Sequence, residues 1–288
     1  MKSIYIKSGI LCGLLIVVMV LNGSYNLFAY PGSANDSGVV TQNQIVRKID
    51  IADWNDRPTS VTDGDVLEVT DTGALYRWSD IADGWIRSDV YDKSLTLLGS
   101  VPYDVDDELD LVNFTETEQN GGVVSYGSGY VDIDITASAA ADAWLGVSTT
   151  SDSNSGFYLS GYFQTPSAAT GGNNYPVNSL IFDTATKLNV LILRGQTTNS
   201  PRFSATVNSS VQSASTFNDA VSSSDFTWVE LMRTTTGFWY LWLDHSSNPV
   251  LIGYDSNSAG FSDAVRIGDF ASVASGRMYV RDVRALQF

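Results

Sequence analysis

The chain has 288 residues and carries 16 Lys and Arg against 32 Asp and Glu, a formal net charge of −16. This length allows one large or two smaller domains with a sizeable core, and the acidity argues against binding to a nucleic-acid backbone. Charged residues make up only 17% and aromatic residues 11%, and Ser, Thr, Gly, Asn and Asp separate the apolar runs. This composition is typical of a β-rich extracellular domain.

The N-terminal segment, residues 1–34, has the pattern of an export signal. Lys2 and Lys7 precede an apolar run over residues 10–21, and small residues follow. A helix of that length spans about 18 Å, short of a hydrocarbon core of about 30 Å, which favours a signal peptide over a membrane span. The alternative is an uncleaved N-terminal membrane anchor, the only membrane contact that we expect. The single cysteine, Cys12, lies in this run, so the mature chain would contain neither a disulfide nor a cysteine zinc site.

A polar linker over residues 35–45 leads into a predicted small β-hairpin module over residues 46–93. Short alternating apolar runs are separated there by the turn dipeptides Asp63-Gly64 and Asp83-Gly84. Residues 57–86 resemble short β segments of bacteriophage tail-fibre and other virion proteins, in which a Gly-Ala-Leu-Tyr-Arg hairpin is followed by a Trp, here Trp78. The alternative is a generic hairpin extension that packs on the following domain.

From residue 94 to residue 288 the pattern changes to longer strands separated by Ser, Gly and Asn loops. A dozen or so strands with no helix between them predict an all-β fold, an antiparallel β-sandwich of two sheets face to face. The expected strands lie near 109–115, 121–126, 130–136, 143–149, 156–165, 178–183, 187–194, 201–207, 226–234, 237–244, 249–254, 264–269 and 277–287.

The strongest local pattern is a buried hairpin over residues 226–254, where Gly237 separates two runs rich in aromatic and β-branched residues. Side chains alternate along a strand, so Trp239, Leu241 and Leu243 share a wholly apolar face that we expect in the core. The opposite face is amphipathic and consists of Phe238, Tyr240, Trp242 and Asp244.

Four segments together resemble the concanavalin A-like jelly roll shared by laminin-G-like domains, legume-type lectins and some glucanases. They are GFYLSGYFQT at 156–165, LNVLILRG at 188–195, the hairpin at 226–244 and GRMYVRDVRALQF at 276–288. The last two resemble the paired central strands of this fold and its final strand, which returns beside the first. The resemblance covers residues 94–288 and implies a jelly-roll sandwich.

Alternation also predicts which side chains face away from the core. Phe157, Leu159 and Phe163 would point inward from one strand, as would Val131 and Ile133 from another. A concave sheet would then present aromatic rings and hydrogen-bonding groups to a sugar. The predicted glycan-binding residues are Tyr158, Tyr162, Gln164, Tyr240, Trp242, Asp132 and Asp134. The alternative is that this face is covered, by the N-terminal module or by a neighbouring subunit.

A glycoside hydrolase is the less favoured interpretation. Retaining glucanases of this fold need two carboxyl groups about 5–5.5 Å apart, and their catalytic strands carry three acids at alternate positions. Asp132 and Asp134 are followed by Thr136, so the third acid is missing, although Glu230 on another strand could join them. We therefore predict no catalytic residues.

No cofactor is expected other than calcium. Asp152 with Asn154, and Asp255 with Asn257, offer hard oxygen ligands, and lectin-like relatives often hold calcium in such loops. The alternative is that these residues form turns. The lone histidine, His245, is expected to make a loop hydrogen bond, because one imidazole without cysteines forms neither a zinc site nor a triad.

These patterns predict a non-catalytic glycan-binding or adhesion protein that is secreted or exposed on a cell or virion surface. The expected partner is a glycan or cell-surface polysaccharide. The alternative function is a structural subunit of a fibre, spike or surface layer, in which the sheet faces contact other copies in a homo-oligomer.

Overall fold

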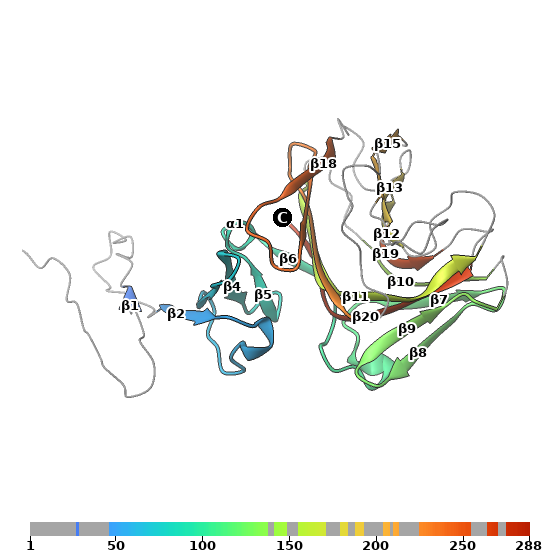
Figure 1. Ribbon diagram of the computed structural model, residues 1–288, viewed down its shortest axis with the longest axis horizontal. Coiled ribbons are helices and arrows are strands. Elements are labelled where there is room, and N and C mark those ends of the chain that lie inside the picture. The colour runs from blue at the N-terminus through green and yellow to red at the C-terminus, as the bar shows by residue number, and fades with distance from the viewer. Residues whose placement is uncertain are drawn as a thin grey trace, which may run out of the picture.

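The computed structural model describes residues 27–28, 46–137, 141–148, 155–170, 179–183, 188–192, 204–207, 210–212, 225–254, 264–269 and 275–288. Two sheets form an antiparallel β-sandwich, and a smaller sheet lies beside it (Figure 1). The predicted all-β sandwich is therefore confirmed. The predicted leader falls outside the described residues except for Leu27 and Phe28. In the described segments, no helix has the length and apolarity needed to cross a membrane.

The small sheet has the order β1-β2-β3-β4-β5. Its strands are β1 (Leu27–Phe28), β2 (Val46–Ile51), β3 (Val66–Val69), β4 (Ala74–Ser79) and β5 (Gly84–Arg87). The pair β2 and β3 is parallel, whereas β3, β4 and β5 run antiparallel, with a turn over residues 70–73 between β3 and β4 and the predicted Asp83-Gly84 turn between β4 and β5. The 3-10 turn η1 (Trp54–Asp56) connects β2 to the rest, and the short helix α1 (Ser88–Tyr91) follows β5. We call residues 46–93 the N-terminal module.

The larger sandwich sheet contains eight strands in the order β18-β17-β16-β11-β20-β9-β8, with β6 also paired to β20. Its strands are β6 (Thr96–Val101), β8 (Val123–Gly127), β9 (Tyr130–Asp134), β11 (Phe157–Thr170), β16 (Thr227–Arg233), β17 (Phe238–Leu243), β18 (Val250–Tyr254) and β20 (Ser275–Gln287). The predicted hairpin at residues 226–254 is confirmed as β16 and β17, which pair antiparallel. The last strand, β20, returns beside β6, the first strand after the module.

The second sandwich sheet contains seven strands in the order β15-β14-β13-β12-β19-β10-β7. These are β7 (Thr115–Gln119), β10 (Asp142–Ser148), β12 (Ser179–Asp183), β13 (Leu188–Ile192), β14 (Ser204–Val207), β15 (Ser210–Gln212) and β19 (Ala264–Asp269). The prediction of a strand near residues 109–115 is wrong, because these residues form the turn η2 (Glu108–Asp110) and a loop that leads into β7. Asp107 and Asp110 form a capping box there, which favours the turn over an extended strand.

The sandwich core follows the predicted alternation. Trp239 and Leu241 of β17 are fully buried between the sheets together with Phe157, Leu159 and Phe163 of β11. The opposing layer comes from β10 and β19, which contribute Ala143, Leu145, Val147, Val265 and Ile267. Because side chains of a strand alternate between faces, the remaining residues of β11, β16 and β17 point to the outer face of the eight-stranded sheet.

A bulge in β20 alters this alternation next to the module. Tyr162 of β11 pairs with Arg281, but Ser160 pairs with Arg284. Three steps along β20 therefore match two steps along β11, which means that β20 contains one extra residue. Asp282 adopts φ +53°, a left-handed conformation that Asp tolerates better than most residues. Gly161 faces the bulge, and a Cβ there would lie 2.6 Å from Cγ2 of Val283. The bulge places Arg281, Asp282 and Arg284 close together beside the module.

The N-terminal module packs on the outer face of the eight-stranded sheet through two apolar clusters. In the first cluster, Tyr162 and Trp228 pack against Trp54, Tyr76 and Trp85 of the module. The second cluster joins residues of β11, β16, β17 and β20 to the part of the module from the turn before β5 to α1. It contains Tyr158, Met232, Trp242, Leu286, Ala82, Ile86 and Val90. The module and the sheet therefore share a buried interface made of these two clusters, and Figure 1 shows the module to the left of the sandwich.

Candidate functional site

A cleft of about 470 Å³ lies where the module meets β20 and the start of the loop after β6. Its volume is within the range of about 300–1,000 Å³ that is common for small-molecule sites. The cleft is lined by Trp54, Asn55, Arg57, Pro58, Thr59, Trp78, Gly84, Trp85, Tyr103, Trp228, Asp282 and Arg284. The lining thus combines aromatic rings with a few charged and amide groups.

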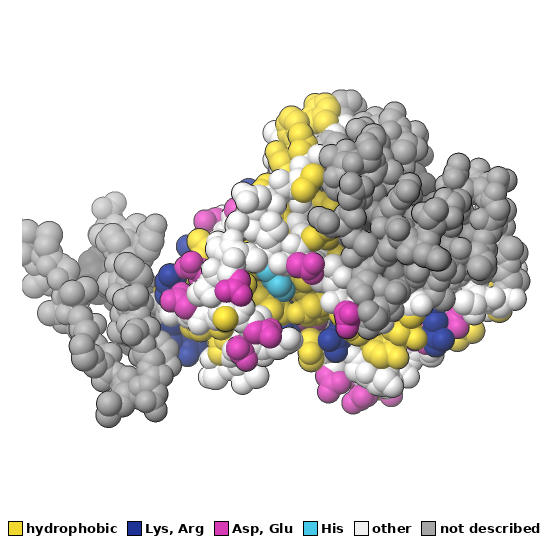
Figure 2. All heavy atoms as spheres, viewed as in Figure 1, with side chains coloured by type: hydrophobic (Ala, Val, Ile, Leu, Met, Phe, Trp, Pro, Cys, Tyr) yellow, Lys and Arg dark blue, Asp and Glu magenta, His cyan; other side chains and the backbone are white. Residues whose placement is uncertain are grey.

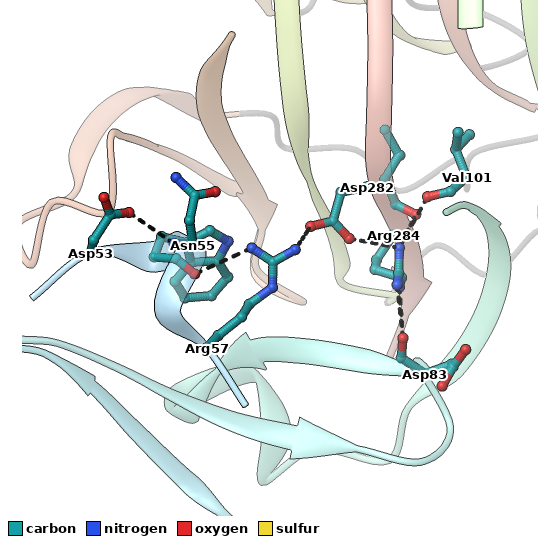
Figure 3. Close-up of polar contacts among 9 residues, drawn as sticks. Asp53, Asn55, Arg57, Asp83, Val101, Asp282 and Arg284 are labelled. Atoms are coloured by element: carbon teal, nitrogen blue, oxygen red, sulfur yellow. Dashed lines mark hydrogen bonds and ion pairs between the residues drawn. The ribbon is translucent and has the colours of Figure 1, made fainter. Parts of the chain in front are cut away.

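Asp282 is the centre of the polar part of the cleft. Arg57 approaches it from the module, with 2.8 Å between Nη2 and Oδ2, and Arg284 approaches from β20, with 3.3 Å between Nη1 and Oδ1 (Figure 3). The side chain of Asp282 is 11% exposed and that of Arg57 is 18% exposed. Partly buried ion pairs of this kind hold their side chains in fixed orientations, so the polar groups are positioned before any ligand arrives.

Arg284 also ties the sandwich to the module. Its Nη2 and Nε donate to the carbonyl oxygen of Asp83 at 2.8 and 3.1 Å, and its Nη1 donates to the carbonyl oxygen of Val101 at 3.1 Å. Gly84 makes room for this side chain, because a Cβ at that position would lie 2.8 Å from Nε of Arg284. A side chain at residue 84 would therefore displace Arg284 from one wall of the cleft.

The aromatic part of the cleft has a buried floor and two more accessible rings. Trp54 and Trp85 are 4% and 5% exposed, whereas Tyr103 is 40% exposed and Trp78 is half-buried. The guanidinium of Arg57 lies 5.2 Å from the Trp54 ring centre and 5.1 Å from that of Tyr103. Among the described residues, the Nε1 groups of Trp54 and Trp85 are buried without a hydrogen-bond partner. Indole N–H groups usually find an acceptor when buried, so these two are unsatisfied donors beneath the floor of the cleft.

Behind the cleft, a buried carboxylate joins the module to the sheet. Glu230 of β16 is fully buried and accepts hydrogen bonds from Tyr76 at 2.8 Å, from Arg87 at 2.9 Å and from Tyr158. Tyr76 and Arg87 belong to the module, whereas Tyr158 belongs to β11. Burial and the neighbouring Glu230 charge raise the pKa of both phenols well above their usual value, so both remain proton donors to the carboxylate.

His245 lies beside this carboxylate and contacts Tyr76, Trp54 and Trp228. Its Nδ1 is 3.1 Å from the Tyr76 oxygen, and its ring stacks on Trp54 and Trp228 with ring centres 4.1 and 5.0 Å apart. Since Tyr76 gives its single proton to Glu230, Nδ1 of His245 must be the donor to the phenol. Burial, then the positive charges of Arg87 and Arg57, lower the pKa of His245 to about 3. The predicted hydrogen bond is present, but it is made in an interface and not in an open loop.

The predicted row of exposed rings is wrong for the residues that the module covers. Tyr158, Trp242 and Tyr162 are 1%, 3% and 8% exposed, and Tyr240 is half-buried. All of them lie on the outer face, as alternation predicted, but the two apolar clusters seal that part of the face. The other interpretation of the pattern, a face covered by the N-terminal module, describes these contacts.

The remaining predicted residues lie on the uncovered part of the same face. The carboxylate of Asp132 accepts two hydrogen bonds from Arg277, of which the one from Nε to Oδ1 is 2.8 Å long. Oδ2 of Asp134 lies 3.8 Å from the same Nε. Gln164 of β11 faces Tyr279, which pairs with Asp132. Glu230 does not join these acids, because β20 and β11 separate β9 from β16, a distance of about 14 Å at the usual strand spacing.

The predicted calcium ligands Asp152, Asn154, Asp255 and Asn257 lie outside the described residues. In the segments that the structure describes, no three His, Cys, Asp or Glu side chains come together as a metal site.

Sequence reasoning missed most of the cleft. Arg57, Tyr103 and Asp282 lie in a loop, in the connection after β6 and in a β-bulge, where alternation gives no prediction. One signal was available for the module residues, because Trp54, Trp78 and Trp85 fall within one short segment of a chain with only seven tryptophans. Large rings concentrated in a small module indicate that it packs on a larger surface.

Comparison with known proteins gives structural similarities only. No protein-family model matches the sequence, and no curated protein matches it either. Cellulose induced protein Cip1 overlaps 60% of this chain and 90% of its own at 16% identity and a TM-score of 0.44. The binding domain of botulinum neurotoxin serotype G overlaps 66% of this chain and 47% of its own at 11% identity and a TM-score of 0.43. The metal-free carbohydrate recognition domain of Emp46p overlaps 60% of this chain and 87% of its own at 11% identity and a TM-score of 0.37.

Proposed function

We propose that this protein binds a carbohydrate without modifying it, and that the binding site is the cleft between the N-terminal module and β20. The observation that carries the proposal is the pairing of accessible rings with fixed polar groups in one concave site. Tyr103 and Trp78 offer apolar faces for the C–H faces of a sugar, and Asn55, Arg57 and Asp282 offer hydrogen bonds to its hydroxyl groups.

The polar groups suit hydroxyl recognition because they are held in place before binding. Arg57 is fixed by Asp282 and by the carbonyl oxygen of Trp54, so little side-chain entropy is lost when a ligand engages it. Asn55 closes the module side of the cleft, where its backbone N–H donates to the side chain of Asp53 (Figure 3).

The charges of the cleft support binding over hydrolysis. Glycoside hydrolysis uses two carboxyl groups, about 5–5.5 Å apart for retention and about 6.5–9.5 Å apart for inversion. Asp282 is the one carboxylate among the residues lining this cleft, and two arginines bind it. A single carboxylate whose two oxygens are both bound by guanidinium groups does not supply the two-carboxyl arrangement that this chemistry uses.

The proposed setting is extracellular, on a cell or virion surface, where the protein acts in adhesion. The apolar N-terminal sequence and the cysteine-free remainder of the chain support this setting. The tail-fibre resemblance of residues 57–86 supports the virion alternative.

The test is a glycan array, followed by affinity electrophoresis in polysaccharide gels for the polymers that bind. The Tyr103→Ala variant should bind at least about tenfold more weakly, a loss of about 1.4 kcal/mol, because it removes the most accessible ring of the cleft. The matched control is Tyr254→Ala, which removes a 51% exposed tyrosine from the β18 edge, far from the cleft along the sheet order. Unchanged binding by Tyr103→Ala, or an equal loss in both variants, would contradict the assignment of the cleft.

A further inference from the structure

The surface next to the cleft holds a cation with a distinctive environment. Arg281 of β20 lies on the outer face, with its guanidinium 4.4 Å from the ring centre of Tyr103, 4.2 Å from that of Phe226 and 5.5 Å from that of Tyr162. Three rings therefore surround it. Aromatic faces attract a guanidinium and orient it, but they do not neutralise its charge.

Arg281 has no carboxylate partner in the part of the chain that the structure describes, and its buried Nε has no hydrogen bond there. The contrast with its neighbours is clear, because Arg57 and Arg284 both bind Asp282, and Arg277 binds Asp132. A buried guanidinium N–H is costly to leave without an acceptor. The structure thus supplies an oriented positive charge and leaves its counter-ion to come from elsewhere.

The cleft itself is also locally basic in a strongly acidic protein. The charged residues that line it are Arg57, Arg284 and Asp282, two cations and one anion, whereas the whole chain carries a net charge of −16. Acidic side chains are spread over the face shown in Figure 2, on both the module and the sandwich. The positive charge at the cleft is therefore a local feature and not a consequence of composition.

Tyr103 connects the two features. Its ring centre is 5.1 Å from the guanidinium of Arg57 in the cleft and 4.4 Å from that of Arg281 on the sheet. Tyr103 is 40% exposed, so a ligand that contacts this residue lies close to both cations. The path continues from Phe226 to Tyr130 at 5.9 Å and to Tyr279 at a further 4.3 Å, which extends the aromatic surface along the sheet.

We propose that the ligand is an acidic glycan and that Arg281 is the residue that selects it, by binding the carboxylate or sulfate of a sugar unit adjacent to the one in the cleft. This inference rests on the proposed function, because it assigns the chemical class of the ligand bound there. A planar guanidinium with free N–H groups matches a carboxylate or sulfate through two parallel hydrogen bonds. The continued row of rings accommodates further units of the same chain.

The experiment measures binding of the full chain to three polymers: polygalacturonate, the same polymer after chemical reduction of its carboxyl groups, and a sulfated galactan. The wild type should bind at least one of the two anionic polymers about tenfold more tightly than the reduced polymer. The two anionic polymers distinguish a carboxylate from a sulfate ligand. Equal binding to all three would overturn the role of Arg281 but leave glycan binding in place. If the protein bound none of the three polymers and no sugar on the array, both the role of Arg281 and the proposed glycan binding would be overturned.

Variants locate the selectivity. Arg281→Gln should lose the preference for the anionic polymer and retain binding to the neutral one, whereas Arg281→Lys should keep part of the preference because it keeps the charge. The matched control is Arg266→Gln, since Arg266 lies 5.2 Å from the ring centre of Trp144 on the other sheet. Thermal unfolding of each variant checks that the fold is retained. A preference that survives Arg281→Gln, or that Arg266→Gln abolishes equally, would refute the proposal.

Discussion

The buried carboxylate of Glu230 provides the most direct test of how the module is attached to the sandwich. Glu230 has no exposed surface and Arg87 has a side chain that is 6% exposed, with 2.9 Å between Oε2 and Nη2. The Glu230→Gln substitution keeps the size of the side chain but removes its charge. Arg87 then retains a buried positive charge without a negative partner, and two phenols face a group that accepts less strongly.

The expected cost is large. Breaking a buried ion pair by removing one partner costs about 3–5 kcal/mol, because an uncompensated charge remains in the interior. For a protein of this size, each 1 kcal/mol corresponds to about 2–4 °C, so the melting temperature should fall by roughly 6–20 °C. The same change should loosen the module, since Tyr76 and Arg87 are its two contacts with the carboxylate.

Urea unfolding followed by tryptophan fluorescence measures the effect, and limited proteolysis within residues 46–93 shows whether the module is released first. The double variant Glu230→Gln with Arg87→Gln should be less destabilised than the sum of the single variants, because it removes both charges. The control Asp92→Asn disrupts an exposed pair with Arg77, where the closest atoms are 3.8 Å apart, and should change stability by no more than about 0.5 kcal/mol. A loss below about 1 kcal/mol for Glu230→Gln would refute the view that this carboxylate holds the interface together.

Three further substitutions test other parts of the structure. The pKa of His245 is about 3 in the folded state and about 6.5 in the unfolded state. Its contribution to the free energy of unfolding is therefore fully present above about pH 6.5 and is lost as the pH falls towards about 3. Lowering the pH from 7 to 4 should therefore reduce the free energy of unfolding by roughly 3 kcal/mol through this residue. The His245→Phe variant should show a flatter dependence of the unfolding free energy on pH. An unchanged slope would contradict the inference that burial lowers the pKa of His245. Trp242→Ala should destabilise the fold by about 3–5 kcal/mol in urea unfolding, because the ring is 3% exposed and lies 4.5 Å from the Arg87 guanidinium; loss of glycan binding with unchanged stability would instead indicate an exposed ring. Gly161→Ala should cost about 1–3 kcal/mol, because its Cβ would overlap Val283 opposite the bulge, and a neutral result would mean that β20 can shift.

Much of the architecture could be predicted from the sequence because alternation reports directly on strands. Trp239 and Leu241 lie in the core as expected, and β16 and β17 form the expected hairpin. The same alternation placed Tyr158 and Trp242 on the opposite face, which is also correct. What alternation cannot report is whether a second layer covers that face, because a covered row and an open row have the same pattern.

The candidate site was not predictable for a related reason. Arg57, Tyr103 and Asp282 are distant in sequence and meet only when the module docks on the sheet. Asp282 would face the core in a regular strand, with Val283 outside it, but the bulge reverses both positions. A single extra residue in a strand reverses which side chains face the interior, and the sequence of β20 shows no Gly at that point to mark it.

The position of β20 has a consequence for how the protein is made. This strand runs through the middle of the eight-stranded sheet, where it pairs with β6, β9 and β11, yet it follows every one of them in the chain. During translation, β6, β9 and β11 are synthesised before β20 and lack this shared neighbour until it emerges, so closure of the sheet depends on contacts between distant parts of the sequence and should be slow. Asp282, Arg284 and Leu286 belong to this same strand, so a nascent chain has neither a complete cleft nor a fully packed module until β20 has been inserted.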